Sequence, residues 1–230
     1  AAQAFNQMQQ RIRDYVSERT RILAAISHDL QTPITRLRLR AELVDDDELR
    51  SRIQADLDSM QALVKEGLAN ARSLDDATPA QPIALDRLLE ALRDDATDMG
   101  WKVRLDGRAD APLVAQPTAL RRALWNLIEN GVKFGGEVDI AVAARPGAFE
   151  IRIRDRGPGL PEDQLEKVFE PFYRLETSRN RETGGTGLGL AITRNLLRRQ
   201  RGEVQLRNAA AGGLEATVLL PRSGEAAAQQ

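Results

Sequence analysis

His28 is the only histidine among 230 residues, and it lies in the run from Ser27 to Pro33. Asp29 can orient and polarise the imidazole, and Pro33 cannot donate a hydrogen bond to the carbonyl of Asp29, so a helix here is weakened or bent just past the histidine. Apolar residues at helical spacing mark one buried face: Ile22, Ile26, Leu30, Leu37, Ala41 and Val44. His28 is expected on the opposite, exposed face, with Thr32 one turn further along. A lone histidine is usually an ordinary core or surface residue, but exposure, an adjacent acid and the proline favour a nucleophile.

A second group of polar residues lies at helical spacing between residues 126 and 134. Asn126, Asn130 and, nearly, Lys133 share one helical face, while Leu127 and Ile128 can face a sheet. Amide oxygens can ligate Mg²⁺, and an ammonium group one turn further can contact phosphate oxygens. The alternative is a polar helix face without a ligand.

An acidic turn follows a predicted strand at Asp155-Arg156-Gly157-Pro158-Gly159. A carboxylate can accept a hydrogen bond from an exocyclic amine such as that of adenine. Gly157 and Gly159 would let a ligand approach the backbone. An ordinary turn remains the alternative for this motif taken alone.

A glycine-rich run, Gly184-Gly185-Thr186-Gly187-Leu188-Gly189-Leu190, leads directly into a predicted helix. Glycines free backbone N–H groups to contact phosphate at the positive end of a helix. The run is not a P-loop, because no Gly-Lys-Ser/Thr follows, and it does not follow a first strand as a Rossmann turn does.

The elements that must position these residues fall into two parts. Residues 5–74 contain one proline and one glycine, and their helical pattern breaks at Asp45–Asp47. It resumes as Leu49, Ile53, Leu57, Met60, Val64, Leu68 and Ala71. This predicts an antiparallel helical hairpin whose acidic turn lies at the start of the second helix. Two helices cannot bury both apolar stripes, so we expect a homodimeric four-helix bundle; the alternative is a hairpin packed on its own C-terminal domain.

Residues 75–82 read as a linker, and mixed helices and strands follow. Helices are predicted near residues 85–92, 118–134 and 188–200, with a short helical piece at 162–169. Strands are predicted near residues 102–105, 113–114, 138–143, 149–154, 204–207 and 216–219. This mixture indicates an α+β two-layer sandwich. The segment 156–187 is long, charged and rich in glycine and proline, and such loops are usually either functional lids or disordered segments.

Composition limits the classes of partner. A net charge of −1 and a pI near 6.1 give no electrostatic reason to expect nucleic acid or an anionic membrane surface as partner. The chain has no cysteine, which excludes thiolate metal sites. No apolar run approaches the ~20 residues that span a bilayer. The opening residues lack an initiator methionine, so we expect a piece of a longer protein.

The order of the motifs resembles the sensor histidine kinases of two-component signalling. Five segments carry the resemblance: Ser27–Pro33, Asn126–Phe134, Asp155–Gly159, Phe169–Arg174 and Gly185–Leu190. It implies a dimerisation and phosphotransfer hairpin over residues 15–74 and a gyrase/Hsp90-like ATP-binding domain over 83–222, with a disordered tail at 223–230. Residues 1–14 resemble the end of a HAMP linker helix. That would make the chain the cytoplasmic portion of a bacterial inner-membrane protein, attached to the membrane by an upstream segment.

The resemblance also implies residue roles. Asn130 would ligate Mg²⁺, Asn126 would line the same pocket, Lys133 would contact phosphate, Phe134 would flank the nucleotide and Asp155 would bind adenine. Further nucleotide contacts would come from Gly157, Gly159, Gly185, Thr186, Gly187, Leu188 and Gly189. Arg174 is a candidate for charge stabilisation at the γ-phosphate. Phe169 and Phe172 would either take part in function or simply anchor the lid. Gln31 departs from the arginine common at its position in relatives.

The implied reaction is phosphoryl transfer from MgATP to His28, followed by transfer to an aspartate of a response regulator. Nε2 would attack while Asp29 stabilises the developing cation. Thr32 would orient water for dephosphorylation of the regulator, unless its hydroxyl bonds the carbonyl of His28. Two rival functions are a gyrase-type ATPase and a nucleotide-binding scaffold without chemistry. The first conflicts with Asn126, which occupies the place of the catalytic glutamate, and the second needs a missing key residue that the motifs do not show.

Overall fold

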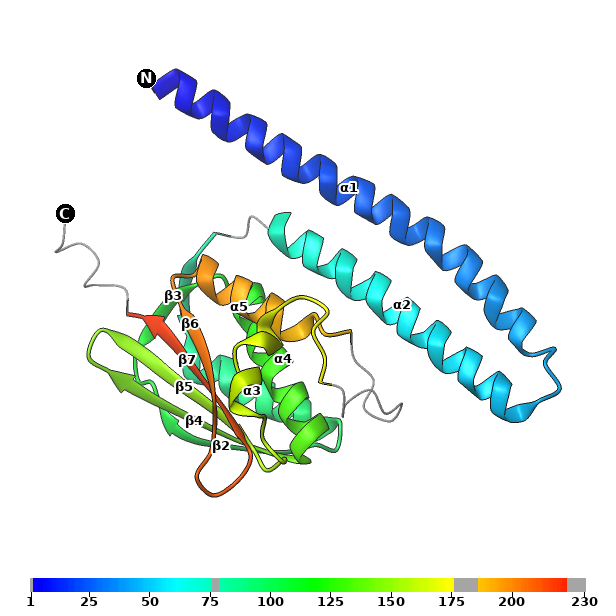
Figure 1. The fold of residues 1–230 in the computed structure, drawn as a ribbon. Helices are drawn as coiled ribbons and strands as arrows, with labels where there is room; N and C mark the ends of the chain where they lie inside the picture. The colour runs from blue at the N-terminus through cyan, green and yellow to red at the C-terminus, as the bar shows by residue number, and fades with distance from the viewer. Residues whose placement is uncertain (1, 76–78, 176–185, 223–230) are drawn as a thin grey trace. The chain divides into compact units, whose positions relative to one another are not determined.

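A computed structural model describes residues 2–75, 79–175 and 186–222, which form a helical unit and an α/β unit (Figure 1). The helical unit is a hairpin of α1 (Ala2–Ala41) and α2 (Asp47–Asp75). The α1 helix continues through Pro33 without a break. Among the described residues, no helix combines the length and apolarity needed to cross a bilayer.

The turn of the hairpin confirms the predicted acidic start of the second helix. Asp46 Oδ1 accepts a hydrogen bond from the backbone N–H of Leu49 at 3.0 Å, which caps α2. Arg50 donates to the carbonyl of Val44 at 2.9 Å, so the first turn of α2 also holds the chain that enters it. Local sequence therefore specifies where the hairpin reverses.

The face of α1 that is buried agrees only in part with the face that the apolar pattern predicts, because Ala41 is buried as predicted and most of the other predicted residues are not. Within α1, Ser27, Ile34 and Ala41 are buried at intervals of seven residues, and Leu57 is their buried counterpart on α2. Most of the predicted face is 40–52% exposed, namely Ile22, Ile26, Leu30 and Leu37. A single neighbouring helix covers only a narrow line of residues on α1, in which one residue is buried every seven residues, or two helical turns. The apolar stripe beside this line of residues stays uncovered in a single chain.

The α/β unit is built on a five-stranded sheet in the order β2-β4-β5-β7-β6. The strands are β2 (Lys102–Arg108), β4 (Glu137–Arg145), β5 (Ala148–Asp155), β7 (Leu214–Pro221) and β6 (Glu203–Asn208). The β2–β4 pair is parallel and the other pairs are antiparallel. Helices α3 (Leu85–Asp98), α4 (Pro117–Gly135) and α5 (Gly189–Arg199) cover one face, as Figure 1 shows. The hairpin followed by a two-layer sandwich matches the predicted fold class.

The structure corrects the predicted linker at both ends. Asp75 still belongs to α2, while Gln81 and Pro82 lie in β1 (Gln81–Ala84), which pairs antiparallel with β3 (Pro112–Ala115). A proline is tolerated in such a two-stranded edge pairing, and the partner strand lies some thirty residues away in the sequence. The predicted helical piece at 162–169 consists of two 3₁₀ turns, Glu162–Gln164 and Lys167–Phe169. The predicted tail at 223–230 lies outside the described residues.

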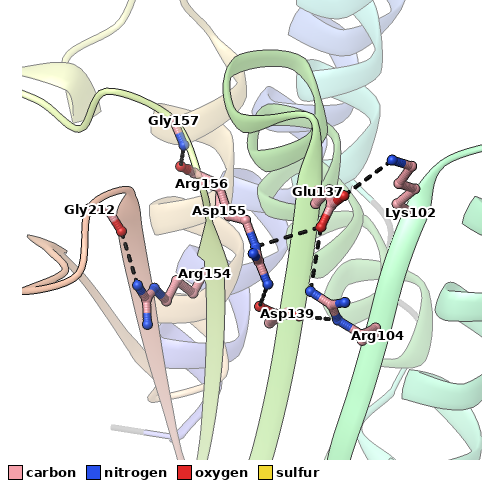
Figure 2. A network of polar contacts seen from close by, with 9 residues as sticks. All are labelled: Lys102, Arg104, Glu137, Asp139, Arg154, Asp155, Arg156, Gly157 and Gly212. Carbon is pink, nitrogen blue, oxygen red and sulfur yellow. Dashed lines mark hydrogen bonds and ion pairs between the residues drawn. The ribbon is translucent and has the colours of Figure 1, made fainter.

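The two faces of the sheet differ sharply in chemistry. On the helix side, Phe149, Ile151 and Ile153 of β5 are buried. On the open side, a row of alternating charge crosses all five strands: Arg104, Asp139, Arg154, Glu215 and Arg207. Figure 2 shows part of this network, in which Arg104 donates to Asp139 at 2.7 Å. The hydrogen bond from Arg104 holds the pKa of Asp139 below its ordinary value. The open face is thus a lattice of ion pairs, while the helix side holds the apolar core.

Candidate functional site

Asp155 is the one charged residue on the core side of β5, and it emerges at the end of that strand with 7% exposure. Its Oδ1 accepts hydrogen bonds from the backbone N–H groups of Gly157 at 2.7 Å and Leu214 at 3.1 Å. Within the described part of the chain, no group donates to Oδ2. The carboxylate is therefore held firmly by one oxygen and has the other available to accept a hydrogen bond from a ligand.

The helix α4 lies with its backbone against this acidic turn because it carries glycines at two positions four residues apart. A Cβ atom at Gly135 would lie 2.6 Å from the backbone nitrogen of Arg156, and one at Gly131 would lie 2.6 Å from Cγ2 of Val138. The close approach brings α4, which carries Asn130, against Asp155: a Cβ atom at Gly131 would lie 3.5 Å from Cβ of Asp155. Sequence reasoning missed both glycines, although two glycines in an otherwise good helix are a signal of close packing.

The polar face of α4 is oriented as predicted. Leu127 and Ile128 are buried, while Asn126 and Asn130 are half-buried. The Nδ2 of Asn126 donates to the carbonyl of Gly189 at 3.3 Å, which joins the asparagine helix to the start of α5. The structure thus brings three of the sequence motifs together around α4.

Lys133 and Phe134 end this helix near the same turn. The Nζ of Lys133 lies 5.2 Å from the centroid of the Phe134 ring, a cation–π distance. Phe134 is 46% exposed, so its ring is accessible to a planar ligand. A positive charge and an open aromatic face at the helix end suit a nucleotide.

The glycine-rich run reaches the site at Gly187, Leu188 and Gly189. Gly187 has φ +73°, and a Cβ there would lie 2.8 Å from the carbonyl oxygen of Tyr173, so this position requires glycine. The α5 helix begins at Gly189, and its positive end is suited to an anion. Thr186 is half-buried, and Gly185 lies outside the described residues.

The aromatic segment before the run is anchored to α5 by a contact that sequence reasoning missed. Arg194 stacks over the buried ring of Phe169, with Cζ 3.5 Å from the centroid. Its Nη1 and Nη2 donate hydrogen bonds to Oε1 and Oε2 of Glu166 at 2.5 and 2.8 Å. The hydrogen bond from Arg194 lowers the pKa of Glu166. Phe169 therefore serves as an anchor. Phe172 is 66% exposed with φ +65°, and Arg174 is exposed.

His28 lies on the exposed face of α1, as predicted. Its side chain is 83% exposed, and Nδ1 lies 3.6 Å from Asp29 Oδ1, close enough for electrostatic interaction but too long for a hydrogen bond. Thr32 is exposed one turn further, and within the described residues its hydroxyl makes no hydrogen bond to the carbonyl of His28. By contrast, Thr35 Oγ1 donates to the carbonyl of Gln31 at 2.9 Å. The imidazole and the Thr32 hydroxyl are both accessible on one helix face.

Two family models match the two units. The His Kinase A (phospho-acceptor) domain matches residues 18–76, and the histidine kinase-, DNA gyrase B- and HSP90-like ATPase matches residues 115–224. The chain is 40% identical over 223 residues to the sensor histidine kinase GtrS of Pseudomonas aeruginosa, covering 97% of this chain and 46% of GtrS. It is 31% identical over 233 residues to the sensor histidine kinase CpxA of Escherichia coli, covering 96% of this chain and 51% of CpxA.

The chain thus spans about half the length of these curated relatives. Among solved structures, full-length ShkA in complex with AMPPNP resembles it with a TM-score of 0.63 and 27% identity, covering 87% of this chain and 45% of ShkA. The hairpin with the exposed histidine lies in the segment that the first model matches, and the sandwich includes the segment that the second model matches. The chain belongs to the sensor histidine kinases of two-component systems.

Proposed function

We propose that the chain transfers the γ-phosphoryl group of ATP to Nε2 of His28 and that the phosphohistidine then donates this group to an aspartate of a response regulator. The observation that carries the proposal is that the only imidazole of the chain is exposed on a helix beside Asp29. The experiment that tests it is incubation of the chain with γ-labelled ATP and Mg²⁺, followed by identification of the labelled side chain.

The nucleotide would bind between α4, α5 and the turn after β5. Asp155 Oδ2 would accept a hydrogen bond from the adenine amine, and Phe134 would flank the ring. Lys133, Arg174 and the backbone groups of residues 186–189 would contact the phosphates; Gly185 belongs to the same proposal. Each of these residues except Arg174 and Gly185 lies on or beside an element that packs against α4.

Mg²⁺ fits the donor set of the proposed site. Among the described residues, no cluster of three or more His, Asp or Glu side chains could hold a metal alone. Magnesium in nucleotide sites is held by one or two protein oxygens together with phosphate oxygens and water. Asn130 would supply its amide oxygen, with Asn126 beside it. When bound, the metal neutralises negative charge on the phosphates.

The chemical step is an in-line displacement. The lone pair of Nε2 forms the N–P bond, the bond between the γ-phosphorus and the bridging oxygen breaks, and ADP leaves with the electron pair. The imidazole becomes cationic because Nδ1 keeps its proton, and the carboxylate of Asp29 stabilises that charge. Steady hydrolysis of the gyrase type is not favoured, since the amide of Asn126 cannot take a proton from water and is engaged with Gly189.

The uncovered stripe of α1 supports a homodimer. Ile22, Ile26, Leu30 and Leu37 are exposed in a single hairpin, and a second hairpin would bury them. A substitution at Leu57 of α2 would not report on the dimer alone, because Leu57 is already buried in the single chain.

We expect Leu37→Asp to dissociate the dimer, because a charge would be buried in the interface without a partner. The dissociation constant should rise by at least about 100-fold. Leu39→Asp is the matched control: Leu39 lies on the same helix and is 66% exposed, about 200° around the axis from Leu37. Light scattering measures the mass of each variant. Equal masses for Leu37→Asp and Leu39→Asp would refute the proposed interface.

Phosphatase activity toward the regulator is proposed for Thr32. Its hydroxyl is not bonded to the carbonyl of His28 and can hold a water near a phosphate docked on this face. Thr32→Ala should slow dephosphorylation of the regulator about tenfold or more while sparing autophosphorylation. Thr35→Ala, which removes a hydroxyl already bonded to Gln31, is the control. Loss of autophosphorylation with the phosphatase rate intact would contradict this role.

The wider setting is also part of the proposal. The chain would be the cytoplasmic portion of a bacterial inner-membrane sensor, with residues 1–14 as the end of a HAMP-like linker helix. Support comes from the relatives, which are about twice as long as this chain, and from α1, which runs unbroken from Ala2 through residue 15.

A further inference from the structure

A single cross-strand pair holds both ends of residues 155–160, the segment that follows β5. Asn208 at the end of β6 lies opposite Leu214 at the start of β7. The backbone N–H of Leu214 donates to Asp155 Oδ1 at 3.1 Å. The carboxamide of Asn208 accepts from the N–H of Leu160 at 2.9 Å and donates to the carbonyl of Leu160 at 2.7 Å. The side chain of Asn208 thus pairs with the backbone of Leu160 as a neighbouring strand would, and it fixes the far end of the segment.

The backbone is packed closely around the hydrogen bonds of Asn208, at Gly159 and at Gly213. Gly159 has φ +74°, and a Cβ atom there would lie 2.5 Å from Asn208 Oδ1. Gly213 has φ +91°, and a Cβ atom there would lie 2.0 Å from the carbonyl oxygen of Asp155. Two glycines therefore allow the β6–β7 hairpin to lie directly against the segment on both sides.

The open face of the sheet adds a third tie. Arg154 donates to the carbonyl of Gly212 at 3.1 Å, and Figure 2 shows this bond beside the one from Gly157 to Asp155. The loop of the hairpin is itself closed by a bond from Ala209 N–H to the carbonyl of Gly213 at 2.9 Å. These bonds fix the β6–β7 hairpin, so the hairpin can hold residues 155–160 in place.

We propose that Asn208 is a positioning residue for the nucleotide site, which sets the path of residues 156–160 and thereby the side of the site that reads the base. The inference rests on the proposed binding of adenine by Asp155. Asn208 acts through Leu160 and Gly159 and does not itself contact the nucleotide. Loss of its side chain would loosen residues 156–160 near the proposed adenine contact of Asp155. The proposed phosphate contacts at the start of α5 would be unaffected.

The test compares Asn208→Asp and Asn208→Ala with Asn195→Asp, the same amide-to-carboxylate change at an exposed position of α5. Calorimetry gives Kd for ATP and for GTP, and thermal unfolding reports stability. Asn208→Asp places a carboxylate oxygen against the carbonyl of Leu160, and Asn208→Ala removes both bonds. Each is expected to raise Kd for ATP about threefold to tenfold and to lower the preference for ATP over GTP. Asn195→Asp should change neither quantity.

The contrary outcomes complete the test. Unchanged Kd values and an unchanged preference for ATP in both Asn208→Asp and Asn208→Ala would overturn the inference. So would a lower melting temperature with the preference for ATP intact, because that is a purely structural effect. A chain that binds no ATP before substitution would overturn the proposed function itself and this inference with it.

Discussion

His28→Gln is expected to abolish labelling of the chain by γ-labelled ATP. The imidazole is the only one in 230 residues, so no second side chain of this type can accept the phosphoryl group. The loss should be at least about 1,000-fold, as for removal of an enzymatic nucleophile. The label on the unchanged chain should be lost in acid and kept in alkali, which distinguishes a phosphoramidate from a phosphoester.

The glutamine variant also carries its own control. His28 belongs to the helical hairpin, whereas the proposed nucleotide site belongs to the α/β unit, so Kd for ATP should stay at the value of the unchanged chain. Label that persists in His28→Gln, or label that resists acid on the unchanged chain, would contradict phosphoryl transfer to histidine.

Asp155→Asn is expected to raise Kd for ATP by about 100-fold. The backbone N–H groups of Gly157 and Leu214 both donate to Oδ1, so the carboxamide must keep its oxygen at that position. Its NH₂ group is then forced into the place of Oδ2, where it meets the amine of adenine as donor against donor. The oxygen of guanine would accept from that NH₂ group, so the preference for ATP over GTP should fall as well.

Asp139→Asn is the matched control for this substitution. Asp139 lies on the neighbouring strand but faces the open side of the sheet, where it binds Arg104 at 2.7 Å. Calorimetry should give the same Kd for ATP in Asp139→Asn as in the unchanged chain. An unchanged Kd in Asp155→Asn would place the adenine elsewhere.

Much of the fold could be read from local pattern. The helices around residues 118–134 and 188–200 and the paired strands around 138–154 appear within a few residues of their predicted bounds. Each of these elements buries one face, so the spacing of its apolar residues, which are close together in the chain, predicts it. The capping carboxylate of Asp46 shows the same principle at the hairpin turn.

Features that depend on a distant partner could not be predicted in this way. The strand β1 was not predicted because the proline-containing sequence around Gln81 gives no sign of its pairing with β3, in which Gln81 lies opposite Ala115. The burial of Ser27 and Ile34 was not predicted, because apolarity alone does not show which of two adjacent faces of α1 packs against α2.

The candidate site divides along the same line. Residue type and order alone determined the chemistry: one imidazole beside an acid, amides on a helix, a carboxylate at a strand end and glycines before a helix. Only the tertiary structure decided how that chemistry is held. Gly131 and Gly135 matter because α4 meets the turn after β5, and Asn208 matters because Leu160 comes beside it. These contacts join segments that are far apart in the chain. They form only when the strands of the sheet pair, because the hydrogen-bonding groups involved are not near one another in the unfolded chain.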